Sequence, residues 1–298
     1  PQGWAGCRES CTPGVDPHDH PDHRTPWSCN LLEDFSGSVP VKPVTLSLTP
    51  PSGSPVAKHG QLRVKGNLIV DKSGNPVVLR GMSFFWSQWM GRFWNEDAVR
   101  WLHSDWHLSL VRAALGVEMG GHLENPHEEM PKLQAVVNAA IKVGIYVIID
   151  WHDHHGEQHK TQARAFFDAM ARTYGNYPNV LFETFNEPVH QSWWHEVKPY
   201  HQEMLSVIRK HSDNLVICGT PKWSSDVDVA SRDPVHGENV AYTIHFYAST
   251  HGEELRQKCR TALNNGVALF ATEWGTCEAT GNGWLHLNEA RAWLGFFK

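Results

Sequence analysis

Seven short apolar segments, spaced about 30 residues apart, are the feature that most constrains the fold of this chain. Helical periodicity lies between them, as in 130–144 and in 192–211, where Ser192 is the expected N-cap. Apolar strands that alternate with amphipathic helices are typical of a parallel sheet covered by helices. The seven segments are VVLRGMS (77–83), SLVRAAL (109–115), IYVIID (145–150), VLFETFN (180–186), NLVICG (214–219), NVAYTIH (239–245) and VALFATE (267–273).

Seven consecutive strand–helix units predict a (β/α)₈ TIM barrel of the α/β class rather than an open sheet. The absence of a GxGxxG or Walker A pattern after an early strand argues against a nucleotide-binding fold. A helix is expected in NEARAWLGFFK, and the chain stops there at Lys298, where an eighth strand should follow. We therefore expect a barrel that is truncated before its eighth strand.

The N-terminal part of the chain differs from the rest in composition. Residues 1–58 are rich in Pro, Ser, Gly, His and Asp, and are predicted to be a low-complexity region that ends in a linker. The tract DPHDHPDH (16–23) is interpreted as part of a polar tail. Residues 59–298 form the predicted catalytic domain, and they begin with short strands around a KSGN turn.

The net charge and the hydropathy of the chain limit the kinds of molecule that it is expected to bind. A net charge of −6 argues against nucleic acid or an anionic membrane, and no apolar run approaches the length of a membrane span. The 14 tryptophans supply flat amphipathic rings that suit sugar faces as well as cores. We expect a monomer.

Polar and aromatic residues recur where the predicted strands end. All strand C-termini share one face of a parallel barrel, and active sites lie on that face. Packing alone would place apolar residues there, so six polar strand ends in register indicate a binding site. These positions are Arg112, Asp150 to His155, Asn186, Glu187, Trp223, His245, Tyr247, Glu273 and Trp274.

Two glutamates occur in the segment LFETFNEP (181–188). Residues 183 and 187 share one face of a strand, about 13 Å apart at about 3.3 Å per residue. Pro188 cannot donate to a sheet and is expected to mark the strand end. Glu187 is then at the mouth of the barrel, whereas Glu183 lies deeper and is predicted to pair with a buried basic group.

The expected partner of Glu187 is Glu273, which ends the seventh segment. Two inward carboxylates at a barrel mouth suggest glycoside hydrolysis, with an acid/base and a nucleophile about 5 Å apart in a retaining enzyme.

At this point the motifs carry a family resemblance. TFNEP and FATEWGT, together with VVLRGMS, LVRAALG, VIIDWHDHH, GTPKWSSDVDVAS and YTIHFYA, resemble glycoside hydrolase family 5. Within this family, the chain most resembles the secreted endo-β-1,4-glucanases of bacteria and some invertebrates. The resemblance spans about residues 60–298. It implies that Glu187 is the acid/base and Glu273 the nucleophile. The supporting and substrate-binding positions that it implies are Arg112, His152, Asn186, Trp223, His245, Tyr247 and Trp89.

Two departures from the family pattern stand out. Phe85 occupies a position where many bacterial members have histidine, so one sugar contact is expected to differ. The eighth strand, which carries a sugar-stacking tryptophan in the family, is missing.

The expected mechanism uses opposite charge states for the two carboxyl groups. Arg112 should keep Glu273 ionised, and the negative Glu273 should raise the pKa of Glu187 so that it stays protonated. Asn186 is placed to bind the 2-hydroxyl of the reacting sugar, and Tyr247 to hold Glu273. The resemblance implies no cofactor and no metal, so the histidines of HDHHGEQH (152–159) are interpreted as part of a loop of sugar-binding polar groups. His152 and His245 are expected to bind sugar hydroxyls or to tune the carboxylates.

The predicted function is a retaining endo-β-1,4-glucanase that hydrolyses cellulose or a related β-glucan and is secreted, because such polymers cannot enter cells. The sequence contains no signal peptide. A β-mannanase or a mixed-linkage glucanase is the alternative within the same chemistry. A catalytically silent glycan-binding fragment is the alternative from another class.

Overall fold

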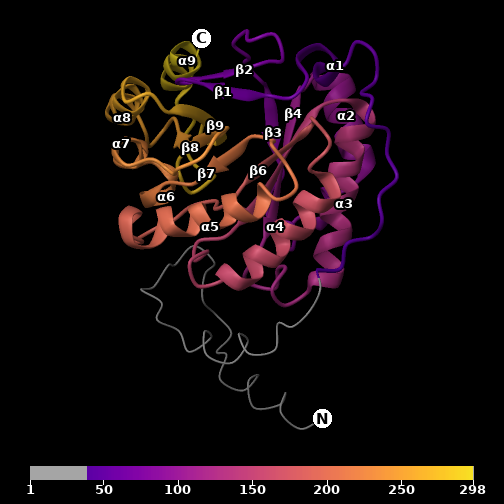
Figure 1. Ribbon diagram of the computed structural model, residues 1–298. Helices are drawn as coiled ribbons and strands as arrows, with labels where there is room; N and C mark the ends of the chain where they lie inside the picture. Colours follow the sequence, from indigo (N-terminus) through magenta and orange to yellow (C-terminus); the bar gives the residue numbers. More distant parts are fainter. Residues whose placement is uncertain (1–38, 298) are drawn as a thin grey trace. The chain divides into compact units, whose positions relative to one another are not determined.

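A computed structural model of the chain describes residues 39–297, and Figure 1 shows their arrangement. The N-terminal histidine tract and Cys7, Cys11 and Cys29 lie outside this part. Within it, seven strands form one parallel sheet in the order β3-β4-β5-β6-β7-β8-β9, which is also their order along the chain. The predicted fold class is therefore confirmed. The strands are β3 (Gly81–Ser83), β4 (Leu110–Gly116), β5 (Tyr146–His152), β6 (Val180–Glu183), β7 (Val216–Cys218), β8 (Val240–Tyr247) and β9 (Ala268–Gly275).

Helices follow the strands and lie on the outside of the sheet (Figure 1). Their side chains and the outward residues of the strands form one large apolar cluster. Ser192 accepts a hydrogen bond from the backbone N–H of His195, as an N-cap does, and the helix begins there with a π-helical turn at Trp193–Val197. The helices are α1 (Pro55–His59), α2 (Glu96–Trp106), α3 (Pro126–Val143), α4 (Lys160–Tyr174), α5 (Lys198–Ile208), α6 (Pro221–Ser224), α7 (Val227–Arg232), α8 (Glu253–Asn264) and α9 (Leu287–Phe296). In α6 the backbone of Lys222 and Trp223 is left-handed, so this short element is a turn rather than a regular α-helix.

Alternation along the strands separates this outer core from the interior of the barrel. In β5, Val147 and Ile149 belong to the outer core, whereas Tyr146 and Ile148 belong to a second cluster inside the sheet. Because successive side chains point to opposite faces, Asp150 then also points inward. The interior is thus apolar at the amino ends of the strands and polar at their carboxyl ends.

The amino ends of the strands are covered by the segment that precedes the sheet. Strands β1 (Arg63–Lys65) and β2 (Leu68–Val70) form an antiparallel hairpin, and the helix α1 packs beside it through Val56. The chain reverses at Gly66 and Asn67, and it reverses again in the predicted KSGN turn, after which Pro76 forms an antiparallel bridge with Val70. Gly66 has φ 63°, a value that glycine adopts without strain. The hairpin leaves the carboxyl ends of the strands as the open end.

Residues 39–58 differ from the linker that composition predicted. Val39, Val41, Val44 and Leu46 pack against the outer core, and the backbone N–H of Lys42 donates to Gln134 over 2.9 Å. The compact unit therefore begins near residue 38, about twenty residues before the predicted boundary. A Pro- and Ser-rich composition hid this packing, because the four apolar residues follow neither a helical nor a strand period.

None of the helices in residues 39–297 has both the length and the hydropathy that a membrane span requires.

Candidate active site

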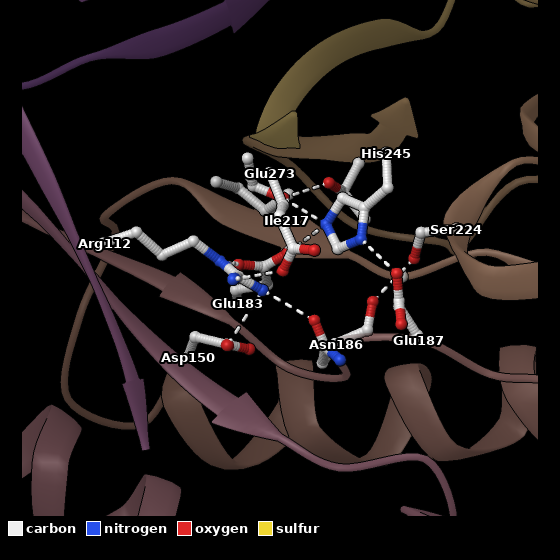
Figure 2. Close-up of polar contacts among 12 residues, drawn as sticks. Arg112, Asp150, Glu183, Asn186, Glu187, Ile217, Ser224, His245 and Glu273 are labelled. Carbon is white, nitrogen blue, oxygen red and sulfur yellow. Dashed lines mark hydrogen bonds and ion pairs between the residues drawn. The ribbon is translucent and has the colours of Figure 1, made fainter. Parts of the chain in front are cut away.

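Arg112 is the centre of a polar cluster inside the barrel (Figure 2). It lies on β4 with only 1% of its surface exposed. Its Nε donates to Glu183 over 2.7 Å, and its Nη1 donates to Glu273 over 3.1 Å. Nη2 lies 2.9 Å from Asp150 Oδ2 and donates to Asn186 Oδ1 over 2.8 Å. One guanidinium thus connects β4 to β5, β6 and β9, and its planar fork fixes where their carboxylates lie.

Glu183 is the deep carboxylate of the cluster, as the strand parity predicted. Its side chain is fully buried, and it pairs with a buried basic group, Arg112. Its other oxygen accepts a hydrogen bond from Thr272 over 2.7 Å. Burial raises the pKa of Glu183, but the charge of Arg112 and the neighbouring His245 outweigh this and lower its pKa to about 2. Glu183 is therefore an ionised, structural acid.

Glu187 does not lie on the strand that the sequence predicted. Strand β6 ends at Glu183, four residues earlier, and residues 184–187 continue as an irregular segment. This segment remains attached to the neighbouring strand, because the N–H of Asn186 donates to the carbonyl of Trp151 over 3.2 Å. Two histidines hold the Glu187 carboxylate: His245 Nδ1 lies 2.8 Å from Oε1, and His154 Nε2 lies 3.2 Å from Oε2.

Glu273 reaches the cluster because β9 carries a β-bulge. Phe270 is opposite Thr243, but Glu273 is opposite His245, so β9 has one residue more than β8 at this point. As a result the consecutive residues Thr272 and Glu273 both contact inward-facing groups, which a regular strand would not permit. Tyr247 donates its hydroxyl to Glu273 Oε1 over 2.6 Å. The Glu273 carboxylate is thus held from two sides, by Arg112 and by Tyr247.

The bulge brings Glu273 and Glu187 together at the mouth of the barrel. One carboxylate oxygen of each and one ring nitrogen of His245 all lie within 4.8 Å of one another. The two side chains are 21% and 15% exposed, in contrast to the fully buried Glu183. This spacing matches the short separation found in retaining glycosidases, about 5–5.5 Å between carboxyl groups.

The charge states differ from the expectation for Glu187. Burial raises its pKa, but hydrogen bonds from His154 and His245 outweigh burial, and the pKa of Glu187 lies well below its usual range. For Glu273, burial likewise raises the pKa, but the charges of His245 and Arg112 together outweigh it, so the pKa of Glu273 is lowered too. Burial lowers the pKa of His245, but Glu273 and the other carboxylates raise it to about 10. The repulsion between the two carboxylates raises the pKa of Glu273, whereas at Glu187 the attraction of two histidines dominates.

Asn186 and His152 each present an unused group to this cluster. Asn186 uses its Oδ1 on Arg112, and its Nδ2 has no hydrogen-bond partner among the described residues. His152 uses Nδ1 on Asp150 at 2.7 Å. Burial and the charge of Arg112 lower the pKa of His152 to about 3, so its ring is neutral.

Exposed aromatic rings flank the cluster on two sides. Trp86 packs edge-on against His152 at 4.4 Å between centroids and stacks on Trp89 at 4.8 Å. Trp89 is 47% exposed. Trp223 is 50% exposed, and its backbone N–H donates to the carbonyl of Pro188 over 2.9 Å, directly beside Glu187 in the sequence.

The structure thus brings the predicted Arg112, His152, Asn186, Glu187, His245, Tyr247 and Glu273 into one cluster, with Trp89 and Trp223 beside it. Sequence reasoning missed three participants: His154 on Glu187, Thr272 between Glu183 and His245, and Trp86 under Trp89. His154 could have been found, because it has the same strand parity as His152. Thr272 could not, because its inward direction depends on the bulge.

Comparisons with known proteins agree with this geometry. The family profile described as Cellulase (glycosyl hydrolase family 5) matches residues 70–298. Endoglucanase Z of Dickeya dadantii is 48% identical over 258 residues, which are 85% of this chain and 60% of that protein. Endoglucanase A of Evansella cellulosilytica is 45% identical over 229 residues, 75% of this chain and 47% of that protein. The chain thus spans about half to three fifths of the length of these relatives.

Solved structures are similar along most of the chain. A structure from Cytophaga hutchinsonii has a TM-score of 0.81 and 48% identity, and the match covers 82% of this chain and 80% of that one. The catalytic domain of Thermobifida fusca endoglucanase Cel5A, solved as a variant in complex with cellotetraose, has a TM-score of 0.78 and 30% identity. That match covers 82% of this chain and 83% of the other.

Proposed function

The chain belongs to glycosyl hydrolase family 5, the cellulase family, and from this premise we propose that it is a retaining endo-β-1,4-glucanase that cleaves internal bonds of cellulose or a related β-glucan. The observation that carries the proposal is the pair Glu187 and Glu273, whose carboxylate oxygens lie within 4.8 Å of each other at the open end of the barrel. The cellotetraose complex of the Thermobifida relative supports a β-1,4-linked glucan as substrate.

Glu273 is the nucleophile in this proposal. Arg112 and Tyr247 hold its two oxygens, so it is ionised and fixed in direction before substrate arrives. It attacks the anomeric carbon while the bond to the leaving oxygen breaks, which gives a covalent glycosyl ester. Water then cleaves the ester, and the two inversions give net retention of configuration.

Glu187 is the acid/base, and its proton comes from the pair that it forms with His245. In the empty cleft the proton resides on His245, whose pKa is about 10, and the carboxylate accepts its hydrogen bond over 2.8 Å. Transfer along this hydrogen bond places the proton on Glu187 when the glycosidic oxygen begins to take up negative charge. Departure of the leaving group with this proton leaves Glu187 as a carboxylate and His245 neutral. Glu187 then takes a proton from the attacking water, and the proton passes back along the same hydrogen bond to His245, which restores the pair.

The remaining groups bind and orient the sugar chain. The Nδ2 of Asn186 is free to donate to the 2-hydroxyl of the reacting sugar, an interaction that strengthens in the transition state. The neutral His152 offers Nε2 to a sugar hydroxyl, since Nδ1 is held by Asp150. Trp89 and Trp223 offer exposed rings to sugar faces on opposite flanks, beside His152 and beside Glu187.

The protein acts outside the cell in this proposal, because its polymeric substrate cannot cross a membrane, and we propose that it does so as a monomer.

The test combines product stereochemistry with two variants. Proton NMR of cellopentaose hydrolysis should show the β-anomer first; an α-anomer would contradict retention. Glu273→Gln should reduce turnover of both cellulose and a dinitrophenyl cellobioside by about 10⁴-fold or more. Glu187→Gln should reduce turnover of cellulose but retain rapid release of dinitrophenolate, which needs no protonation. Equal loss on both substrates would reverse or remove the assignment of Glu187.

Substrate identity is tested by initial rates on carboxymethylcellulose, lichenan and mannan. Higher kcat/KM on carboxymethylcellulose is expected. Preference for mannan would favour a mannanase, and calorimetric binding of cello-oligosaccharides without turnover would indicate a silent glycan-binding protein.

A further inference from the structure

The histidines of the segment HDHHGEQH, residues 152–159, lie in two different groups of side chains. His152 and His154 face the carboxylate cluster, where they contact Asp150 and Glu187. His155 and His159 turn away from it toward Glu118, a residue in the loop after β4. The second pair is therefore unused by the proposed hydrolysis.

Glu118, Asp153 and His159 each offer a ligand atom that lies within 4.8 Å of the other two, and His155 contacts the same Glu118 carboxylate. His155 Nδ1 lies 3.1 Å from Glu118 Oε2, and His159 Nε2 lies 3.9 Å from Glu118 Oε1. The two histidines are four residues apart on one helical turn, because the N–H of His159 donates to the carbonyl of His155. The separation of 3.9 Å is too long for a hydrogen bond. It is within the reach of two ligands bound to one ion, since two bonds of about 2.1 Å span at most about 4.2 Å.

Asp153 orients His159 in this group. Its Oδ2 lies 2.8 Å from His159 Nδ1, which leaves Nε2 directed toward Glu118. Asp153 is itself fixed, because its fully buried carboxylate accepts hydrogen bonds from the Trp151 indole and from the N–H of His155. A carboxylate that holds the far nitrogen of a histidine is the usual outer partner of a metal-binding imidazole.

From this geometry we propose that Glu118, His155 and His159 form a binding site for a zinc-like divalent transition-metal ion, with Asp153 as the residue that orients His159. Two imidazoles and a carboxylate suit Zn²⁺, Cu²⁺ or Ni²⁺, whereas Ca²⁺ and Mg²⁺ prefer oxygen ligands. The two carboxylates balance the charge of a divalent ion. His155 is 44% and Glu118 is 22% exposed, so an ion and its remaining water ligands have access from solvent.

The site lies next to the catalytic cluster but shares no residue with it. His154 lies between Asp153 and His155 and contacts Glu187, so a bound ion would fix the loop that carries this contact. The ion therefore acts on loop order and takes no part in bond cleavage. Hydrolysis is expected to survive its removal.

The experiment measures Zn²⁺ binding to the full chain. The N-terminal tract holds His18, His20 and His23, which would also bind metal. Changing these three to Gln gives a background in which calorimetry reports the loop alone. One Zn²⁺ per chain is expected, and Ca²⁺ should not compete. Absence of stoichiometric Zn²⁺ binding in this background, or preference for Ca²⁺, would overturn the proposal.

Single variants then locate the ligands. His159→Gln and Glu118→Gln should weaken Zn²⁺ binding at least tenfold, and Asp153→Asn should weaken it about 10- to 100-fold. His195→Gln, at an exposed histidine on the π-helical turn, is the matched control and should leave affinity unchanged. X-ray absorption on the zinc form should show two imidazoles, and only one after His155→Gln. Unchanged affinity in His159→Gln, with an unchanged melting temperature of the metal-free protein, would refute the site.

Discussion

Arg112 donates from Nε to Glu183 over 2.7 Å, and neither side chain has more than 1% of its surface exposed. The pair connects β4 to β6 at the depth where the interior changes from apolar to polar. Arg112 uses its other nitrogens on Glu273, Asn186, Asp150 and Ser83. A structural ion pair therefore sets the position of the proposed nucleophile.

Glu183→Gln should lower both stability and turnover. Removing one partner of a buried ion pair leaves an uncompensated charge and typically costs about 3–5 kcal/mol in the free energy of unfolding. Arg112 would then shift relative to Glu273, and a misplacement of about 1 Å reduces turnover about 100-fold. Urea unfolding and kcat on carboxymethylcellulose measure the two effects. The control is Glu254→Gln, at an exposed glutamate on α8, which should change neither the free energy of unfolding nor kcat. Equally small changes in Glu183→Gln would contradict the structural role of Glu183.

Tyr247→Phe should reduce kcat more than it changes KM. The substitution deletes the 2.6 Å hydrogen bond to Glu273 Oε1, and a hydrogen bond to a charged group is worth about 1.5–3 kcal/mol. Turnover should fall about 10- to 100-fold. Loss of a donor raises the pKa of a carboxylate, so the acid limb of kcat/KM should move to higher pH. An unchanged acid limb would show that the hydroxyl does not tune Glu273.

His245→Gln should move the alkaline limb of kcat/KM to lower pH. In the native protein the His245–Glu187 pair keeps its proton until His245 titrates, with a pKa of about 10. Without the imidazole, Glu187 must hold the proton alone and loses it at a lower pH. Rates on an aryl cellobioside between pH 4 and 10 give both limbs. An alkaline limb that stays in place would mean that His245 does not carry this proton.

The same histidine should make stability depend on pH. Its pKa in the folded state is about 10, above the ordinary value of 6.5. Its contribution to stability is therefore complete below about pH 6.5 and is lost as the pH rises through 10. The difference in free energy of unfolding between the native protein and His245→Gln should shrink across this range. A difference that is constant from pH 6 to 10 would contradict the raised pKa.

Lys222→Gly should stabilise the protein relative to Lys222→Ala. Lys222, Trp223 and Ser224 have φ values of 55°, 55° and 54°, a left-handed turn that costs about 1–2 kcal/mol for each residue with a Cβ. Glycine removes this strain at one position, whereas alanine keeps it, and both remove the same exposed side chain. Thermal melting should show a higher midpoint for the glycine variant by a few degrees. Equal midpoints would show that the turn is not strained.

The strained turn also matters for the site, because it is hydrogen-bonded to the segment that holds Glu187. Ser224 donates its hydroxyl to the carbonyl of Asn186 over 2.6 Å, and the N–H of Trp223 donates to Pro188. The strain is thus associated with the position of an exposed aromatic ring next to the proposed acid/base.

The sequence by itself determined the fold and the two proposed catalytic carboxylates. Seven apolar segments at regular spacing require a parallel sheet with helices outside, and the carboxyl ends of such strands meet at one face. Strand parity separated the buried Glu183 from the mouth and predicted its basic partner. The inferences about the sheet and about Glu183 hold because they depend only on periodicities of the backbone. The two catalytic carboxylates stay predictions, which rest on the strand ends and on the family motifs.

Only the tertiary structure decided how the site is assembled. The bulge that turns both Thr272 and Glu273 inward arises from pairing between β8 and β9, so a period of two cannot show it. The low pKa of Glu187 depends on two histidines from different strands and loops. Glu118, which meets His155 and His159 across a loop, has no signature in the sequence near them. Charge states and ligand groups depend on distances between segments remote in sequence, and those distances are set by packing of the whole barrel.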